Sequence, residues 1–478
     1  MNRTLRVVLA ALAAGSLLAS LTAPAGASNA SDEQEADIDA RGTLYSVPTE
    51  PARCQVYGSG TSSGEICFHW VITTDDAVAA VDADANGVPD YVDSVATVFD
   101  QVWAKVIVEY GYRPPLPDDD SINHGPNRAL DVYLAEIGDE GSYGSCETDD
   151  PDQATGRQVS AYCVLDNDYG TEYDPGVSGM DALRVTAAHE FFHAVQFGYD
   201  YKRVRSEAWL SEGTAVWIED EVFDDINANY TYLVDSGLHQ PEISLNAFGK
   251  IGDEEDFEYG AWVFWRFLSD YVDDPTIVRE VWESVSAETR ALEAIRAALE
   301  PRISVEGSNL TPAQKFSRTF GDFGAFNSAA DFFYDEGAGF LQALDNRYSP
   351  TDATFILDER DASTGWRRLS IDHLASRYVE FDAWDDTLPA GARLRIDVDL
   401  PPRRTGSEAR VLSFFQGGCL NGKYVKMDRR GDGRQTVDFK SGTCRDSELD
   451  VFTSYLTFTN TSWKKDDQIF KYRARVIL

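Results

Sequence analysis

Apolar and polar residues follow two different periods along the chain, and the change of period divides it into two parts. Up to residue 357, stretches with helical spacing alternate with short apolar runs bounded by turn residues. This mixture is typical of an α+β arrangement with a sheet in the first half and helices in the second. The patterns predict helices over residues 91–110, 262–271 and 289–299, and strands over residues 130–134 and 162–165.

From Trp366 onward, apolar and polar residues alternate with a period of two, interrupted by Gly and Pro. The clearest runs are residues 394–400, 455–460 and 472–477. Such alternation predicts strands with one buried face, and several together predict an all-β sandwich. We therefore expect an α+β domain at residues 51–362 and a β-sandwich domain at residues 366–478.

The first 27 residues have the composition of a secretory signal peptide. A basic start is followed by an apolar run over residues 7–21 and by small residues near Ala27. The run is short for a membrane span, although a retained anchor is the alternative interpretation. Residues 28–50 are polar and acidic, which predicts a linker or a short propeptide. We expect a secreted, extracellular protein without a membrane span in its mature form.

Six cysteines fall into three pairs that are close in sequence, which favours three short-loop disulfides in a secreted chain. Six cysteines allow about fifteen connectivities, so proximity is a preference only. No Cys-x-x-Cys occurs, which disfavours a cysteine zinc site. The expected pairs are Cys54 with Cys67, Cys146 with Cys163, and Cys419 with Cys444.

The chain has 81 acidic and 42 basic side chains and a formal net charge of −39. A negative field of this size makes nucleic acid and anionic membrane surfaces poor partners. Surplus acidity is often a matter of solubility alone, but it also favours retention of divalent cations. The charge therefore leaves open whether any cation is specifically bound.

Residues 185–196 contain His-Glu-x-x-His within an apolar run of helical spacing. Two imidazoles four residues apart, His189 and His193, share one helix face and can bind one metal ion. Glu190 lies between them, where its carboxylate can take a proton from an attacking water. The alternatives to a metal site are a chance match to the motif or a set of buried structural polar groups. A third metal ligand later in the sequence would distinguish a metal site from both. Catalytic zinc normally has three protein ligands.

Glu212 follows His193 by nineteen positions and lies within a second helical stretch. The segment around it reads Trp209-Leu210-x-Glu212-Gly213. This spacing and context resemble the third-ligand helix of gluzincin zinc metallopeptidases, over residues 165–268. The resemblance implies a thermolysin-like core with zinc held by the two histidines and Glu212, and Glu190 as general base. Either Glu219 or Asp220, two turns farther on, is expected to orient a ligating histidine, unless both are solvated helix charges.

Two departures from the aminopeptidase branch of that family refine the prediction. The branch's Gly-x-Met-Glu-Asn stretch is missing, which favours an endopeptidase. Phe257 stands where the branch has a transition-state tyrosine, and Tyr259 is the nearest phenol that can donate to an oxyanion. Core packing is the alternative role of Tyr259. The run at residues 162–165 is expected to be either a substrate-binding edge strand or a buried strand of the sheet.

Residues 82–93 place oxygen ligands as in an EF-hand calcium loop, with Gly87 at the sixth position. Asp93 replaces the usual glutamate at position twelve. The alternative is an acidic turn before a helix. The expected calcium ligands are Asp82, Asp84, Asn86, Asp90 and Asp93, together with the backbone carbonyl of Val88.

The sequence thus predicts a secreted zinc-dependent metallopeptidase that acts on protein or peptide substrates. The alternative from another class is a calcium-stabilised extracellular binding or adhesion protein with a vestigial zinc site. An intact Glu190 argues against that alternative, since a structural metal does not need the carboxylate. Hydrolysis of a non-peptide bond also stays open, because metal and fold do not fix the substrate. The oligomeric state is left undetermined.

Overall fold

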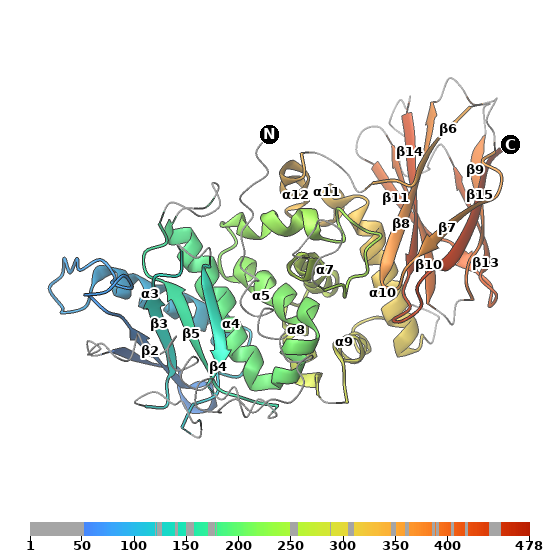
Figure 1. Cartoon of the computed structure of the whole chain (residues 1–478). Coiled ribbons are helices and arrows are strands. Elements are labelled where there is room, and N and C mark those ends of the chain that lie inside the picture. Colours follow the sequence, from blue (N-terminus) through green and yellow to red (C-terminus); the bar gives the residue numbers. More distant parts are fainter. Residues whose placement is uncertain are drawn as a thin grey trace, which may run out of the picture. The chain divides into compact units, whose positions relative to one another are not determined.

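The computed structural model (Figure 1) describes most of the chain from Ala52 to Leu478. The expected signal peptide and the acidic segment that follows it lie outside the described residues, as does Cys444. The described residues are 52–119, 121, 127–138, 142–149, 157–170, 177, 179–248, 257–286, 288–304, 310–345, 350–358, 363–384, 388, 392–402, 406–415, 419–438 and 451–478.

The chain forms two compact units. The first comprises the described residues up to Asn229 together with Val278–Ala291, and the second comprises Tyr230–Ile277 and Leu292–Leu478. Each has its own sheet or sheets and its own buried apolar side chains. The chain as a whole is α+β, with a mixed sheet first, helices in the middle and two further sheets at the end.

The first unit contains a five-stranded mixed sheet in the order β1-β2-β3-β5-β4. Its two outer pairs are antiparallel, whereas β2, β3 and β5 run parallel to one another. The strands are β1 Arg53–Tyr57, β2 Gly64–His69, β3 Leu130–Ala135, β4 Gly144–Thr148 and β5 Ala161–Asp166; a 3-10 turn, η1, spans Gly60–Ser62.

Helices α3 and α4 pack against this sheet, with the ring of Phe99 lying 5.2 Å from that of Phe68 on β2 and α4 contacting β4 and β5. Helix α3, Asp90–Trp103, continues as a π-helical segment, η2, at Ala104–Glu109 and contacts α4, Gly179–Ser206. The ring of Phe191 on α4 lies 6.1 Å from Phe99 and 5.8 Å from Trp103 on α3. Helix α5, Ala208–Val222, packs against α4 in turn. Helix α4 is therefore held in the core between sheet and helices.

Two of the three predicted cysteine pairs form disulfide bonds. Cys54–Cys67 joins β1 to β2, and Cys146–Cys163 joins β4 to β5. In both cases the cysteines stand directly opposite each other in an antiparallel register, so a short loop brings them together. The third predicted pair, Cys419 with Cys444, lies outside the described residues at Cys444.

The second unit begins with short helices followed by longer ones. Its α10 starts with the capping box Thr311 and Gln314, and Pro312 takes the first helical position. The helical segments are η5 Asn227–Asp235, α6 Phe257–Gly260, α7 Trp262–Val272, α8 Thr276–Ser284, α9 Ala291–Leu299, α10 Pro312–Asn327, α11 Ala330–Phe333 and α12 Gly337–Ala343. Three of these segments, η5, α8 and α9, cross the boundary between the units.

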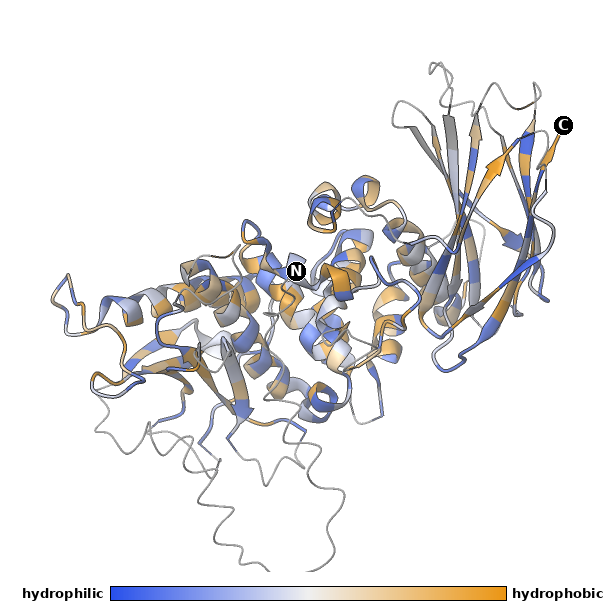
Figure 2. Cartoon of the chain, turned by 45° about the horizontal axis from the view of Figure 1, so that its top comes forward, coloured by the Kyte–Doolittle hydropathy of each residue, from blue (hydrophilic) through white to orange (hydrophobic). Residues whose placement is uncertain are grey.

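Two five-stranded sheets complete the second unit and enclose one apolar core, with the orders β11-β10-β14-β8-β6 and β12-β13-β9-β15-β7. Figure 2 shows hydrophilic and hydrophobic residues alternating along these strands, as the sequence predicts. The strands are β6 Ala353–Leu357, β7 Arg367–Ile371, β8 Ala375–Trp384, β9 Arg393–Asp399, β10 Ser407–Phe415, β11 Cys419–Tyr424, β12 Lys426–Met427, β13 Asp432–Asp438, β14 Val451–Asn460 and β15 Gln468–Ile477.

Helix α10 covers the outward face of the first of these sheets, at β10 and β14. Buried ion pairs contribute to this contact, since the guanidinium of Arg410 on β10 donates to Asp322 on α10 and to Glu408, at 2.8 Å each.

Strand β6 pairs in parallel with β8 and lies before the expected start of the sandwich domain at Trp366. Among the described residues, no helix is both long and apolar enough to span a bilayer.

Candidate metal centre

Helices α4 and α5 bring together the three residues that the sequence singled out as metal ligands. His189 and His193 lie one turn apart on α4, and Glu212 comes from α5. The ligand atoms of the three side chains all lie within 4.8 Å of one another. Both histidines are buried, and Glu212 is only partly exposed. This buried group can hold a metal ion.

The separation between the ligand atoms fits a small tetrahedral cation. Glu212 Oε2 lies 3.2 Å from His193 Nε2 and 3.4 Å from His189 Nε2. Zinc bonds of about 2.0–2.1 Å in tetrahedral geometry place neighbouring ligand atoms about 3.4 Å apart. Two of the three separations therefore match a tetrahedral site, and the third lies within 4.8 Å, so the two imidazoles and the carboxylate could hold one ion.

Charge gives a second reason to expect a cation at this group. Three carboxylates, those of Glu190, Glu212 and Glu219, lie around the two imidazoles in a buried environment. Buried carboxylates are costly unless they are paired or coordinate a metal. Oxygen Oε2 of Glu190 is buried and has no hydrogen-bond partner among the described residues. This oxygen therefore has unused capacity to accept a hydrogen bond.

Glu219 orients His189, which decides between the two residues that the sequence offered. Its Oε1 atom lies 2.6 Å from His189 Nδ1, and both side chains are buried. Asp220 instead accepts a hydrogen bond from Asn229. A proton on Nδ1 that is donated to Glu219 leaves the lone pair of Nε2 free to bind a metal. Glu219 is two helical turns beyond Glu212, so both carboxylates share one face of α5.

Gln196 performs the same task for His193, and sequence reasoning missed it. Its Oε1 atom lies 2.9 Å from His193 Nδ1, and its amide donates to the carbonyl of Ser211 and to Thr214 Oγ1. The indole of Trp282 also donates to Thr214 Oγ1, at 3.2 Å. The only signal in the sequence was the spacing of three residues from His193, which places Gln196 on the same helix face.

The pKa values within the group shift in opposite directions. Burial raises the pKa of Glu190 and that of Glu219. For Glu212, burial acts in the same direction, but the charges and hydrogen bonds of His193 and His189 outweigh it and lower the pKa. A raised pKa suits Glu190 as a proton acceptor, and a lowered one keeps Glu212 ionised as a ligand.

We expect Glu219→Gln to weaken metal binding and activity by about ten to one hundredfold, since an outer carboxylate raises the basicity of its histidine. The measurement is zinc affinity by competition with a chelator, together with peptide turnover. Glu221→Gln is the matched control, because Glu221 lies on the same helix but bonds to Tyr110. Equal losses in the two variants would contradict an orienting role for Glu219.

One edge strand of the sheet, β4, runs beside α4. Strand β4 pairs with β5 on one side and is the last strand in the sheet order. Added at Gly144, a Cβ atom would lie 2.9 Å from Cγ of Glu190 and 2.7 Å from Cγ2 of Thr186, so glycine permits this close approach. The segment at residues 162–165 lies in β5, between β3 and β4, so the buried-strand alternative holds and β4 is the edge.

The predicted calcium loop gathers carboxylates before α3. Ligand atoms of Asp82, Asp84 and Asp90 lie within 4.8 Å of one another, and Asp82 accepts from the backbone of Asn86 and Gly87. The positive φ of Gly87, 88°, provides the sharp turn. Asp93 differs from the expectation of a free ligand, because its carboxylate forms an ion pair with Arg53 and accepts from Asn86.

Tyr259 lies in the second unit, on the short helix α6. It is buried, and its ring stacks on Tyr232 with centroids 5.2 Å apart.

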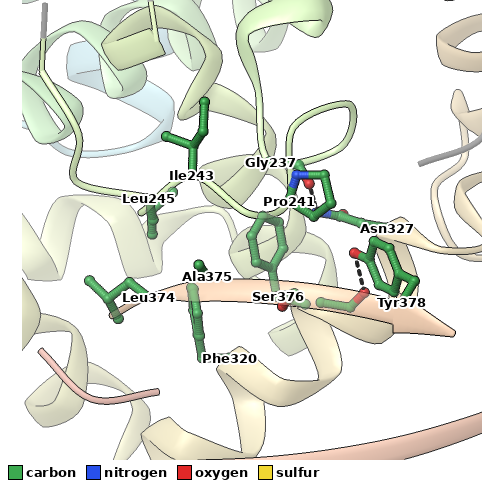
Figure 3. Close-up of a pocket in the computed structure, with 12 residues that line it drawn as sticks. Gly237, Pro241, Ile243, Leu245, Phe320, Asn327, Leu374, Ala375, Ser376 and Tyr378 are labelled. Atoms are coloured by element: carbon green, nitrogen blue, oxygen red, sulfur yellow. Dashed lines mark hydrogen bonds between the residues drawn. The ribbon is translucent and has the colours of Figure 1, made fainter. Parts of the chain in front are cut away.

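The second unit also contains a small pocket between α10, β8 and the segment around Pro241 (Figure 3). No carboxylate, histidine, lysine or arginine is among its lining residues, and Tyr378 and Asn327 donate to backbone carbonyls there. This pocket offers no acid–base or metal chemistry.

Two solved structures show distant likenesses to this chain. No protein-family model matches the chain, and no curated protein sequence matches it. The catalytic module of the metalloprotease ZmpA from Clostridium perfringens aligns over 87% of this chain and 73% of its own, at 10% identity and a TM-score of 0.25. A GH115 4-O-methyl-α-glucuronidase, BtGH115A, aligns over 77% and 53%, at 8% identity and a TM-score of 0.15.

Proposed function

We propose that the protein is a secreted zinc metallopeptidase of gluzincin type with a thermolysin-like core, acting as an endopeptidase. The supporting observation is the buried group of His189, His193 and Glu212, with the Glu190 carboxylate beside it. Three ligands and a separate carboxylate are the composition of a catalytic site, since a structural site has no use for the fourth group. The two disulfides are typical of proteins exported to oxidising compartments.

A zinc ion held by these ligands would polarise the scissile carbonyl and lower the pKa of a water. Glu190 accepts the proton of the attacking water, which its buried and unpartnered Oε2 is placed to do. The carboxyl group then donates this proton to the leaving amine. Glu219 and Gln196 keep the Nε2 atoms of the two histidines directed toward Glu212 throughout.

Strand β4 is proposed to hold an extended peptide substrate. It ends the sheet beside α4, so its outer backbone groups can pair with a further strand. Backbone pairing recognises peptides with little dependence on their side chains, which suits an endopeptidase. The disulfide Cys146–Cys163 fixes β4 to its neighbour, and Sγ of Cys146 lies 2.9 Å from the carbonyl oxygen of Glu190.

The proposal is tested by cleavage of a random peptide library with the mature protein. Cleavage within peptides is expected, lost on treatment with a chelator and restored by zinc. Release of single N-terminal residues would instead indicate an aminopeptidase. Stable zinc binding without cleavage of any peptide would favour the extracellular binding protein or a non-peptide substrate.

Tyr259 is proposed to donate its phenol to the oxyanion that forms during the reaction. We expect Tyr259→Phe to lower kcat by about tenfold to a thousandfold with little change in KM, as for the loss of one transition-state donor. Steady-state kinetics on one cleaved peptide provide the measurement. Tyr232→Phe is the control, because it alters the stacked partner and preserves the phenol of Tyr259. A normal kcat with a lower melting temperature would assign Tyr259 to the core.

Calcium is proposed to stabilise the loop at residues 82–93 and the start of α3. The closely placed carboxylates of Asp82, Asp84 and Asp90 repel one another unless a cation is bound. The amide oxygen of Asn86 and the carbonyl of Val88 complete the proposed ligand set. Asp93 contributes through its contact with Asn86 and its ion pair with Arg53.

We expect calcium to raise the melting temperature of the wild type, since it binds the folded loop better than the unfolded chain. At about one hundred times its Kd, a ligand adds about 2.7 kcal/mol of stability. The effect should vanish in an Asp82→Ala, Asp84→Ala variant and persist in an Asp224→Ala, Asp225→Ala control, which removes two exposed acids elsewhere. Identical melting curves of the wild type with and without calcium would show that the loop is an acidic turn and not a calcium site.

A further inference from the structure

Four arginines surround one buried aspartate on the second sheet of the sandwich. Asp397 on β9 accepts hydrogen bonds from Arg395 on the same strand, from Arg434 on β13, and from Arg473 and Arg475 on β15. Leu394, Ile396 and Val398 alternate with these residues and belong to the apolar core. The arginine cluster therefore lies on the outward face of the β12-β13-β9-β15-β7 sheet.

Asp397 organises the cluster without neutralising it. Four guanidiniums and one carboxylate give a local net charge of +3, within a chain whose formal net charge is −39. Hydrogen bonds from Arg434, Arg473 and Arg395 outweigh the effect of burial and lower the pKa of Asp397 to about 2. The carboxylate thus stays ionised and holds the arginine side chains in place, which reduces the entropy that they lose on binding a ligand.

The cluster keeps most of its hydrogen-bonding capacity. Each guanidinium has five N–H donors, so four have about twenty, and five hydrogen bonds from them reach Asp397. Arg434 is 60% exposed, Arg475 33% and Arg473 30%. Guanidinium groups bind carboxylates through two parallel N–H donors. Among the described residues, these guanidiniums therefore keep N–H donors that do not reach Asp397, and the exposed ones are suited to further carboxylates from a ligand.

An exposed aromatic ring adjoins the same charges. Trp366 is 52% exposed, and the guanidinium of Arg473 lies 5.0 Å from the centre of its ring. The indole gives the face a flat apolar platform on which a ring with polar edges can stack. Helix α10 covers the outward face of the other sheet and leaves this one without a helix among the described elements. The combined surface is cationic and aromatic.

We propose that this arginine cluster and Trp366 bind an acidic polysaccharide whose sugars carry carboxylates. Sugar carboxylates would pair with the arginines while a neighbouring sugar ring stacks on the indole. Cations two residues apart on a strand are about 6.6–6.8 Å apart. This spacing suits a polymer that carries one carboxylate on every sugar or on every second sugar. Duplex DNA, with one charge per about 1.7 Å, would be repelled far more strongly by the rest of this acidic chain.

The test is binding of the full mature protein to polygalacturonate at low and physiological salt. We expect binding that weakens as salt increases, since cationic contacts release counterions. Arg434→Gln, Arg475→Gln should weaken it by about tenfold at low salt, as should Trp366→Ala. A Lys202→Gln, Arg205→Gln variant removes two exposed charges on α4 and should bind within about twofold of the wild type.

Neutral dextran, duplex DNA and phosphatidylglycerol vesicles serve as further probes, and none should bind comparably. Equal losses in the control and the cluster variants, or binding of DNA or vesicles as tight as that of polygalacturonate, would overturn the proposal. So would absence of binding by the wild type. The melting curve of each variant shows whether it is folded. Trp366→Ala tests the loss of polysaccharide binding independently, because it leaves the ion pairs of Asp397 intact. Peptidase activity is not part of this readout, so the proposal stands or falls separately from the catalytic one.

Discussion

Glu190→Gln is expected to retain its zinc and to lose at least about a hundredfold in kcat, since a positioned general base contributes about 10²–10⁴. The change is nearly isosteric and leaves His189, His193 and Glu212 untouched. It removes the carboxylate that accepts the proton, and the amide that replaces it cannot do so. The measurements are zinc content by elemental analysis and turnover of one cleaved peptide.

Glu190→Asp is the informative companion variant. It restores the carboxylate on a side chain one methylene shorter, so activity between that of Glu190→Gln and the wild type is expected. A melting temperature unchanged in both variants separates lost chemistry from lost folding. Wild-type turnover by Glu190→Gln would remove Glu190 from the mechanism and favour a binding protein with a structural metal.

Glu212→Ala is expected to lose most of its zinc as well as its activity. The wild type should hold about one zinc per chain, and removal of one of three ligands leaves only the two imidazoles of α4. His189→Ala should behave in the same way, since it removes a ligand from the other helix. Dialysis against a chelator followed by elemental analysis provides the measurement.

Loss of metal has to be separated from loss of the fold in these variants. Glu212 is only partly exposed and its carboxylate contacts Nε2 of both histidines, so its removal also takes one polar contact from each buried imidazole. Circular dichroism and the melting curve show whether α4 and α5 persist. A folded Glu212→Ala protein with a full equivalent of zinc would exclude Glu212 from the ligand set.

Most secondary structure followed from local pattern. The helix predicted at residues 91–110 is α3 with its π-helical continuation, and the strands predicted at 130–134 and 162–165 are β3 and β5. The apolar run of helical spacing that contains the two histidines ends at residue 196, but α4 extends to Ser206, with non-helical backbone at Asp200. Asp200 is held there by an ion pair with Arg157, which is remote in sequence.

The sequence by itself determined those features that depend on spacing within one element. His189 and His193 share a face because an α-helix repeats every 3.6 residues, and the opposed cysteines of β1–β2 and β4–β5 are separated only by short loops. The acidic loop before α3 is equally local. In each case, the backbone geometry of a few residues fixes which side chains meet.

Only the tertiary structure decided the features that depend on pairing between distant segments. Strand order placed β4 and not β5 at the edge, and helix packing selected Glu219 over Asp220 as the partner of His189. The arginines of β13 and β15 reach Asp397 only through the register of three strands far apart in sequence. Local propensities do not encode strand order or helix packing, because long-range burial of apolar faces sets them.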